Sequence, residues 1–269
     1  MKIGAISDLH VDRHPKLEQD EYLNVLSQVI QQRKLDILLI AGDISNDYQM
    51  SYHFIKQLKD NINIPTYFIP GNHDLWSDDS DKTSTEILDY YKSKEECLIG
   101  RPFIINDEWA IVGNTGWYDY SYADTRFTQD KIQKGKHYGA TWQDKVRMDW
   151  SLSDQQLSKL AANKVEEDIK QVGNRNIILM THIVTHPQFV VPTPHRIFDF
   201  FNAFIGTHDF DAIYEAYPIK YSIMGHVHFR KEIKENGITY LCPCLGYQRQ
   251  WRTPDMEMEM NHALVDFDI

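Results

Sequence analysis

The chain has 269 residues, of which 42% are apolar and 25% are charged, a composition typical of a globular protein with a large buried core. Its 28 Lys and Arg against 39 Asp and Glu give a formal charge of −11, so we expect neither an extended nucleic-acid footprint nor a membrane partner. The three cysteines do not suggest a disulfide framework, and there is neither a signal-like start nor a membrane-length apolar run, so we expect a cytoplasmic protein.

The first 75 residues predict repeated strand-then-helix units. Short apolar runs predict strands over 3–6, 36–41 and 66–69. The second run is apolar without alternation, as expected for a strand that is covered on both faces. An i, i+3, i+4 apolar stripe predicts a helix over 17–33, and residues 45–47 offer N-caps for a helix that runs to Leu58.

The rest of the chain continues this pattern with one interruption. Residues 114–150 are rich in aromatic side chains without clean periodicity, so we interpret them as an inserted loop or small cap. We find no repeat or linker and expect a single domain over 1–269. The other predicted elements are helices over 83–92, from 153 and over 210–217, strands over 109–113, 177–181 and 221–224, an irregular segment over 183–209, and antiparallel strands over 231–269.

Residue types that bind metals follow the predicted strands at five places. These are Asp8-Leu9-His10, Gly42-Asp43, Gly71-Asn72-His73-Asp74, His182 and Gly225-His226-Val227-His228. Any one alone is more simply interpreted as a helix cap or an ordinary histidine. Five clusters at strand ends, where the loops of an α/β sheet converge, favour one shared site. Because side chains at i and i+2 of a strand point to the same side, we expect each D-x-H or H-x-H pair to face one point.

The donor set combines imidazoles, carboxylates and one amide, with no thiolate. This mixture suits Mn, Fe or Zn rather than a structural zinc site or a calcium loop. It also offers more ligands than one ion needs, and two ions that share a carboxylate are typical of phosphoryl hydrolysis. We therefore expect two divalent ions as cofactors, with Mn first and Fe or Zn as alternatives.

In this order the five clusters resemble the motifs of the calcineurin-like metallophosphoesterase superfamily, from Met1 to about residue 245. The resemblance implies an α/β (α+β) four-layer sandwich, with two mixed β-sheets flanked by helices. It implies a first metal held by Asp8, His10, Asp43 and His228. It implies a second metal held by Asp43 as the bridge, Asn72, His182 and His226.

The same resemblance makes His73 the general acid, with Asp74 orienting it. A hydroxide activated by the metals would attack phosphorus, and His73 would protonate the leaving oxygen. After Gly42-Asp43 the chain lacks the Arg-bearing motif of the phosphoprotein phosphatases, and it reads GNHD rather than GNHE. We therefore expect a small phosphodiester or nucleotide-like phosphoester as substrate.

Two other functions stay open at this point. One is a DNA or RNA nuclease of the repair type, against which the net charge of −11 counts. The other is a non-catalytic metal-binding scaffold for protein interaction, although every ligand position and His73 are filled. Arg13, His14 and Arg249 are weaker candidates for phosphate contacts. The aromatic residues between 117 and 122 either stack a planar substrate group or pack the insertion, and we favour packing.

Overall fold

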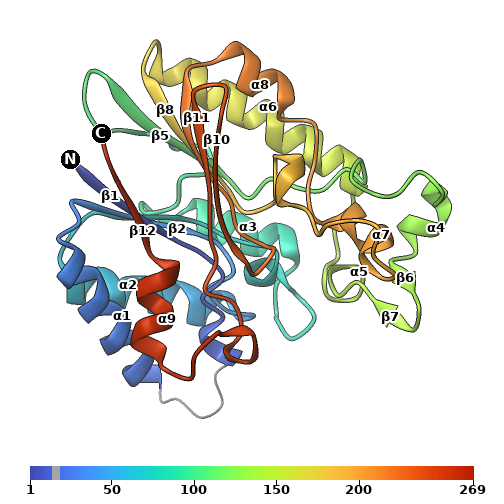
Figure 1. The fold of residues 1–269 in the computed structure, drawn as a ribbon, viewed down its shortest axis with the longest axis horizontal. Helices are drawn as coiled ribbons and strands as arrows, with labels where there is room; N and C mark the ends of the chain where they lie inside the picture. The colour runs from blue at the N-terminus through green and yellow to red at the C-terminus, as the bar shows by residue number, and fades with distance from the viewer. Residues whose placement is uncertain (14–18) are drawn as a thin grey trace.

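The computed structural model describes residues 1–13 and 19–269. Its first sheet has the strand order β12-β1-β2-β3, in which β1, β2 and β3 are parallel and β12 is antiparallel to β1 (Figure 1). Helices α1, α2 and α9 cover the outer face of this sheet (Figure 1). The bounds are β1 Lys2–Ile6, β2 Ile37–Ala41, β3 Thr66–Ile69, β12 Val265–Asp268, α1 Gln19–Arg33, α2 Tyr48–Ile62 and α9 Met256–Ala263.

The second sheet has the order β10-β11-β9-β8-β5-β4, with a parallel centre and an antiparallel strand at each edge. Helices α6 and α8 lie on its outer face (Figure 1). The bounds are β4 Phe103–Ile104, β5 Trp109–Asn114, β8 Asn176–Thr181, β9 Ile219–Ile223, β10 Arg230–Glu235, β11 Ile238–Pro243, α6 Asp154–Val172 and α8 Asp211–Ala216. Helix α3 (Ser84–Lys92) begins at a capping box formed by Thr83 and Glu86, close to its predicted start.

The alternation of side chains along β8 shows how the layers pack. Ile178 and Met180 join the core between the two sheets, whereas Ile177 and Leu179 join the core beneath α6 and α8. All four are fully buried, which is why the strand is apolar without alternation. The predicted four-layer sandwich of two mixed sheets flanked by helices is therefore confirmed.

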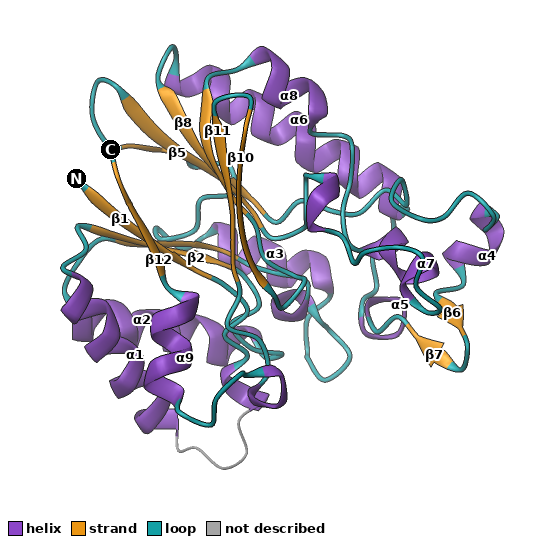
Figure 2. Ribbon diagram, in the orientation of Figure 1, coloured by secondary structure: helices purple, strands orange, loops and turns teal. Residues whose placement is uncertain are grey.

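Residues 114–150, called the cap segment below, begin at the last residue of β5. They contain α4 (Gln129–Gln133), β6 (Lys136–His137), β7 (Ala140–Thr141) and α5 (Asp144–Arg147), which lie away from both sheets (Figure 2). The aromatic residues of the cap segment pack against α7 (Phe198–Phe201) and against the residues that follow α7, and together they form a third core cluster. Within the described parts of the chain, no helix is long and apolar enough to cross a bilayer.

Two predictions about the ends of the chain need comment. The alternating stretch from Met256 was expected to be a strand, but it forms α9, so this prediction was wrong. The side chain of Asp255 accepts a hydrogen bond from the backbone N–H of Met258 and caps the helix, and the buried Met260 and Ala263 lie three residues apart on one helix face. The start of the predicted 17–33 helix, and the candidate His14, involve residues 14–18, outside the described residues.

Candidate metal centre

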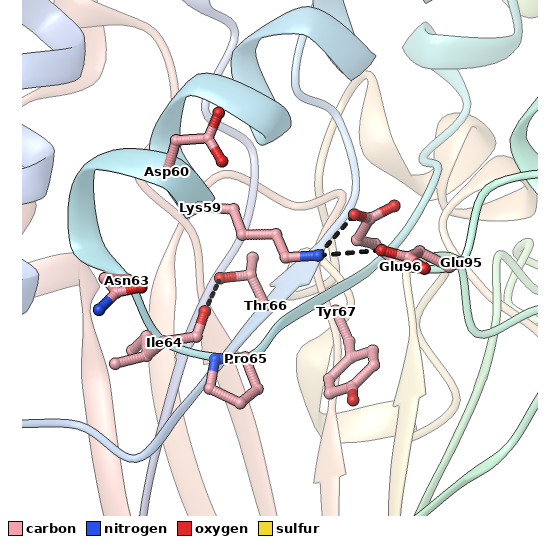
Figure 3. Close-up of a pocket in the computed structure, with 9 residues that line it drawn as sticks. All are labelled: Lys59, Asp60, Asn63, Ile64, Pro65, Thr66, Tyr67, Glu95 and Glu96. Carbon is pink, nitrogen blue, oxygen red and sulfur yellow. Dashed lines mark hydrogen bonds and ion pairs between the residues drawn. The ribbon is translucent and has the colours of Figure 1, made fainter.

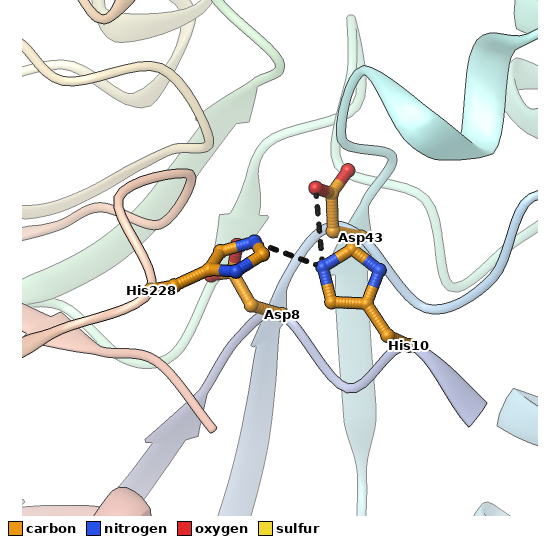
Figure 4. A group of neighbouring side chains, drawn as sticks. All are labelled: Asp8, His10, Asp43 and His228. Atoms are coloured by element: carbon orange, nitrogen blue, oxygen red, sulfur yellow. Dashed lines mark hydrogen bonds and ion pairs between the residues drawn. The ribbon is translucent and has the colours of Figure 1, made fainter. Parts of the chain in front are cut away.

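The loops that follow β1, β2, β3, β8 and β9 bring the predicted ligands together. Two groups of nitrogen and carboxylate ligand atoms result, in each of which the atoms lie within 4.8 Å of one another. The first group is Asp8, His10, Asp43 and His228 (Figure 4). The second group is Asp43, His182 and His226. Asp43 belongs to both, in the position that a bridging carboxylate would take.

Backbone strain is concentrated at these residues. Ten non-glycine residues of the described chain have positive φ, and five of them are candidate ligands: Asp8, His10, Asp43, His226 and His228. Such left-handed conformations cost energy and cluster at functional sites. The residues therefore lie in turns beyond the strand ends, and the expected i, i+2 alternation is wrong. Asp8 and His10 still meet in one group, but His226 and His228 separate into different groups.

Glycines let these turns approach one another closely. A Cβ atom on Gly71 would lie 2.2 Å from Oδ1 of Asp43, and one on Gly225 would lie 2.8 Å from Oδ2 of Asp8. Both distances are shorter than any normal contact, so a side chain at either position would displace a candidate ligand. The glycines of these motifs are thus needed for close packing around the centre.

In the first group, two imidazoles point at each other across a short gap. Nε2 of His10 lies 3.0 Å from Nε2 of His228 and 3.7 Å from Oδ2 of Asp43 (Figure 4). Nε2 of His228 lies 3.3 Å from Oδ1 of Asp8. On its other side, Nδ1 of His228 is 2.9 Å from Oε1 of Gln250, so a proton on Nδ1 would leave Nε2 free as a ligand.

In the second group, Asn72 completes the donor set. Its Oδ1 lies 3.0 Å from Nε2 of His182 and 2.8 Å from Nδ1 of His226. The opposite ring nitrogens face backbone carbonyls, Ala41 at 2.8 Å and Phe204 at 2.9 Å. Donation to these carbonyls directs the lone pairs of both imidazoles toward Asn72 and Asp43. This arrangement is the usual support of a metal-binding histidine.

Burial and the shared carboxylate set the protonation of this cluster. Burial alone would lower the pKa of His182, but the nearby Asp43 carboxylate outweighs it and raises the pKa to about 10. Burial, reinforced by His182, lowers the pKa of His226 to about 3. Burial likewise holds the pKa of His10 well below its usual value. A bound cation would take the place of the proton on His182, because a liganding imidazole must be neutral.

The residues present fit a pair of divalent cations. Oδ2 of Asp43 and Nδ1 of His10 are buried without a hydrogen-bond partner among the described residues. The two imidazole nitrogens 3.0 Å apart cannot both donate to each other, whereas both can ligate one cation. Nitrogen and carboxylate donors without thiolate suit a catalytic transition-metal site.

His73 lies at the edge of the centre. Its backbone N–H donates to Oδ1 of Asp43 at 2.9 Å, and its Nε2 lies 3.9 Å from Oδ2 of the same carboxylate. Trp76 lies against its ring, with the ring centroids 3.8 Å apart. Burial lowers the pKa of His73 to about 4, and His228 and His182 contribute despite Asp43. His73 is therefore neutral at pH 7 in the free site, and a further anionic group beside it would raise this pKa.

The predicted orienting role of Asp74 was wrong. Nδ1 of His73 lies 2.7 Å from Oδ1 of Asn46, which is its hydrogen-bond partner. The Asp74 carboxylate instead accepts bonds from the backbone N–H groups of Ile44, Ser45 and Gly71, and one from the Ser51 hydroxyl. Asp74 thus ties the turn after β2 to the turn after β3. The sequence placed it next to His73, but its side chain points into the loop backbone.

A cavity of about 780 Å³ opens over the centre, lined by Asp43, Asn72, His73, His226 and His228. Other parts of its wall come from the cap segment, from residues 191–205 and from residues 247–250. The cavity is also lined by Trp76, Trp142, Asp144 and Tyr247, which no sequence motif marks as site residues. Aromatic or acidic residues that are far apart in a sequence do not form a motif, so the sequence does not indicate that they line the same cavity.

The weaker candidates divide between the cavity and the core. Arg13 and Arg249 line the cavity, together with Arg147 of the cap segment. Trp117 and Tyr118 are buried in the third core cluster, so the favoured packing interpretation holds for them. A second hollow of about 600 Å³ surrounds Lys59, which pairs with Glu95 and Glu96 (Figure 3). It lies at the opposite end of β3 from Gly71 and plays no part in the centre.

Comparison with known proteins finds a similar fold and similar sequences. The crystal structure of the phosphopantetheinyl hydrolase from Mycobacterium tuberculosis is similar, with a TM-score of 0.75, 19% identity, and coverage of 93% of this chain and 91% of that chain. A probable cyclic nucleotide phosphodiesterase of Coxiella burnetii is 25% identical over 234 residues, 85% of this chain and 76% of that protein. A 3′,5′-cyclic-nucleotide phosphodiesterase of Nostoc sp. is 32% identical over 82 residues, 28% of this chain and 31% of that protein.

A match to a family sequence profile covers the region of the chain that contains the five motifs. The sequence profile of the calcineurin-like phosphoesterase family matches residues 1–230, which include all five motif clusters. The matched region ends within β10, before the loop that carries Tyr247 and Gln250. With this match, the shared fold and the two groups of candidate ligands, the chain belongs to the calcineurin-like phosphoesterase family.

Proposed function

We propose that this protein is a dinuclear metal-dependent phosphodiesterase that acts on a small diester of the cyclic-nucleotide type. The observation that carries the proposal is the pair of ligand groups that share Asp43 at the floor of a cavity of about 780 Å³. Family membership supports a hydrolase, and the names of the relatives from Coxiella burnetii and Nostoc sp. support the diester class. Mn²⁺ remains the first expected metal, with Fe or Zn as alternatives, since imidazole, carboxylate and amide donors suit all three.

Two bound cations would supply charge neutralisation for the phosphate oxygens and a water of lowered pKa. The side chains of this protein account for the remaining steps. Asn72 is a neutral ligand, so it limits the negative charge that faces an anionic substrate. Arg13, Arg147 and Arg249 line the same cavity and would attract the phosphate in a chain of net charge −11.

His73 is the proposed general acid. Nδ1–H of His73 donates a hydrogen bond to Oδ1 of Asn46, which leaves Nε2 directed toward the Asp43 side of the cavity. A bound phosphodiester brings negative charge beside this imidazole and raises its pKa from about 4. His73 can then take up a proton and donate it from Nε2 to the leaving oxygen.

A phosphopantetheinyl ester is a second candidate substrate. The similar fold of the Mycobacterium tuberculosis hydrolase suggests it, and the cavity has a wall that would suit a long, flexible chain. That wall is largely apolar and is formed by Val191, Phe198, Ile205 and Val227. Both candidate substrates are hydrolysed by attack on phosphorus, so both would use the same metal centre. They differ in the group attached to the phosphate, which the apolar wall would have to bind.

The test uses metal-stripped protein with added Mn²⁺. We expect faster hydrolysis of bis-p-nitrophenyl phosphate than of p-nitrophenyl phosphate, and turnover of 3′,5′-cyclic AMP. His73→Ala should lower kcat by about 10²–10⁴-fold because the leaving oxygen loses its proton donor. The Mn²⁺ content of the variant, measured by elemental analysis, should stay at two ions per chain, because His73 is not a proposed ligand.

His208→Ala is the matched control, since His208 pairs with Asp211 on an exposed surface away from the cavity. Turnover of a phosphopantetheinylated protein with none of cyclic AMP would favour the second candidate. Cleavage of linear DNA would favour the nuclease instead. Two bound Mn²⁺ with no turnover of any ester would contradict the proposed activity and support a scaffold.

A further inference from the structure

One buried carboxylate of the cap segment joins the second ligand group to the cap. Asp144 is only 4% exposed, at the start of α5. Its Oδ1 accepts hydrogen bonds from Nδ2 of Asn72 at 2.9 Å and from Nε1 of Trp76 at 2.8 Å. Its Oδ2 accepts them from Nε1 of Trp142 at 3.0 Å and from the hydroxyl of Tyr118 at 3.3 Å. Four hydrogen-bond donors from three segments thus surround the Asp144 carboxylate, which when ionised can only accept hydrogen bonds.

The first consequence concerns the amide of Asn72. The two ends of an amide side chain are distinguished by their partners, and a carboxylate partner requires the NH₂ end. Asp144 therefore fixes the NH₂ of Asn72 on the cap side. The carbonyl oxygen must then face His182 and His226, at 3.0 Å and 2.8 Å from their nitrogens. Only this orientation makes Asn72 a possible metal ligand, because an amide nitrogen does not bind these metals.

The second consequence concerns the two indole rings held by Asp144. Trp76 lies against the ring of His73, and the Arg147 guanidinium lies over Trp76, 4.7 Å from the ring centroid. Trp142 packs edge-on against the ring of His226, with the centroids 5.7 Å apart. A single carboxylate therefore touches one proposed ligand directly and holds the ring neighbours of two further site residues.

We propose that Asp144 is a positioning residue, through which the cap segment sets the Asn72 carbonyl toward the second metal position. The inference rests on the proposed metal centre. It assigns the cap segment a role beyond covering the cavity, because the second ligand group is complete only when α5 is docked. Asp144 begins α5, which follows the β6–β7 hairpin, so the position of Asp144 depends on how the whole cap segment folds.

Asp144→Asn tests the inference with almost no change in shape. Each oxygen of Asp144 accepts two donors, so the new NH₂ would face two N–H or O–H groups in either orientation. We expect the affinity of the second site for Mn²⁺ to fall by about 10–100-fold, the usual range for loss of a ligand's partner. Calorimetric titration of the metal-free protein with Mn²⁺ measures this directly. At low Mn²⁺ kcat should fall with little change in KM, and excess Mn²⁺ should restore it.

Asp154→Asn is the matched control. Asp154 is also buried, at 7% exposure, and accepts hydrogen bonds from Trp117, Tyr120 and Lys145, but it touches no proposed ligand. Both variants should lower the Tm, because each loses hydrogen bonds of a buried carboxylate. Only Asp144→Asn should weaken the binding of Mn²⁺.

Exchange of the two side chains provides a second test. In the double variant Asn72→Asp with Asp144→Asn, the amide at 144 can donate to the carboxylate at 72, whose other oxygen can ligate the metal. We expect tighter Mn²⁺ binding than in Asp144→Asn alone. Wild-type affinity in Asp144→Asn, or no gain on exchange, would overturn the positioning role. Failure of the wild-type protein to bind Mn²⁺ would instead overturn the proposed metal centre.

Discussion

The two ligand groups share Asp43 but differ in how their other members are supported. In the second group, His182 and His226 face backbone carbonyls, and Asn72 faces the buried Asp144. In the first group, His228 relies on Gln250, a residue of an exposed turn, and Nδ1 of His10 has no partner among the described residues. The His228 side chain is also 12% exposed, whereas His182 is fully buried.

This difference indicates which metal position the fold holds more rigidly. Backbone carbonyls inside a packed core cannot move away, so the second group is held ready for a cation. In the first group, His228 depends on a surface turn, whose support water can replace at small cost. We therefore expect the second position to bind Mn²⁺ more tightly than the first and to release it last to a chelator.

Removal of the shared carboxylate should have the largest effect, because it breaks both groups at once. Asp43→Asn keeps the shape but removes the charge that both metals would share. We expect loss of both bound Mn²⁺ and a fall in kcat/KM of at least about 10³-fold, the upper range for one electrostatic group. Metal analysis with steady-state kinetics measures both. Retention of one tightly bound Mn²⁺ would mean that Asp43 does not bridge.

A smaller and selective effect is expected at the first group. Gln250→Ala removes the acceptor for Nδ1 of His228, which lies 2.9 Å away. We expect about 10-fold weaker Mn²⁺ binding at the weaker site only, the lower end of the range for a lost partner. Gln248→Ala, in the same short turn and lining the same cavity, is the control. A change at the tighter site instead would reverse the proposed order of the two positions.

The smallest effect on activity should come from Glu259, outside both groups. This residue is fully buried in α9 and accepts hydrogen bonds from Arg230 and from the backbone N–H groups of Arg252 and Thr253. Glu259→Gln should lower the free energy of unfolding by about 2 kcal/mol, because the partly buried Arg230 loses its charged partner. Mn²⁺ affinity should not change, and calorimetric titration would reveal any link between α9 and the metal centre.

The pH dependence of this loss has a definite sign. Burial alone would raise the pKa of Glu259, but its bonds with Arg230 and the backbone outweigh burial and lower it. A carboxyl group with a lowered folded-state pKa stabilises the protein above its unfolded-state pKa, and this contribution is lost as the pH falls through the folded-state pKa. The difference in unfolding free energy between wild type and Glu259→Gln should therefore shrink below about pH 4. The unfolding free energies of both proteins can be measured by urea unfolding. A difference between them that stays constant from pH 7 to pH 3 would contradict this prediction.

Much of the fold could be predicted because it depends on local patterns. Apolar runs marked β1, β2, β3 and β8, and capping residues marked the starts of α3 and α6. The alternation that suggested a strand at Met256 failed because Glu259, which is charged, is buried against the distant Arg230. Local periodicity cannot report a charge that is neutralised by a partner elsewhere in the chain. That the 269 residues form one domain stays a prediction, which a single unfolding transition would support.

The order of the five motifs predicted the family, and the resemblance to that family named every residue of the two ligand groups. How these residues are held depends on the tertiary structure. The left-handed turns at Asp8 and His228, the pairing of His73 with Asn46, and the anchoring of Asn72 by Asp144 all depend on contacts between segments far apart in sequence. Such contacts arise from the packing of loops in space, which leaves no periodic or compositional trace along the chain.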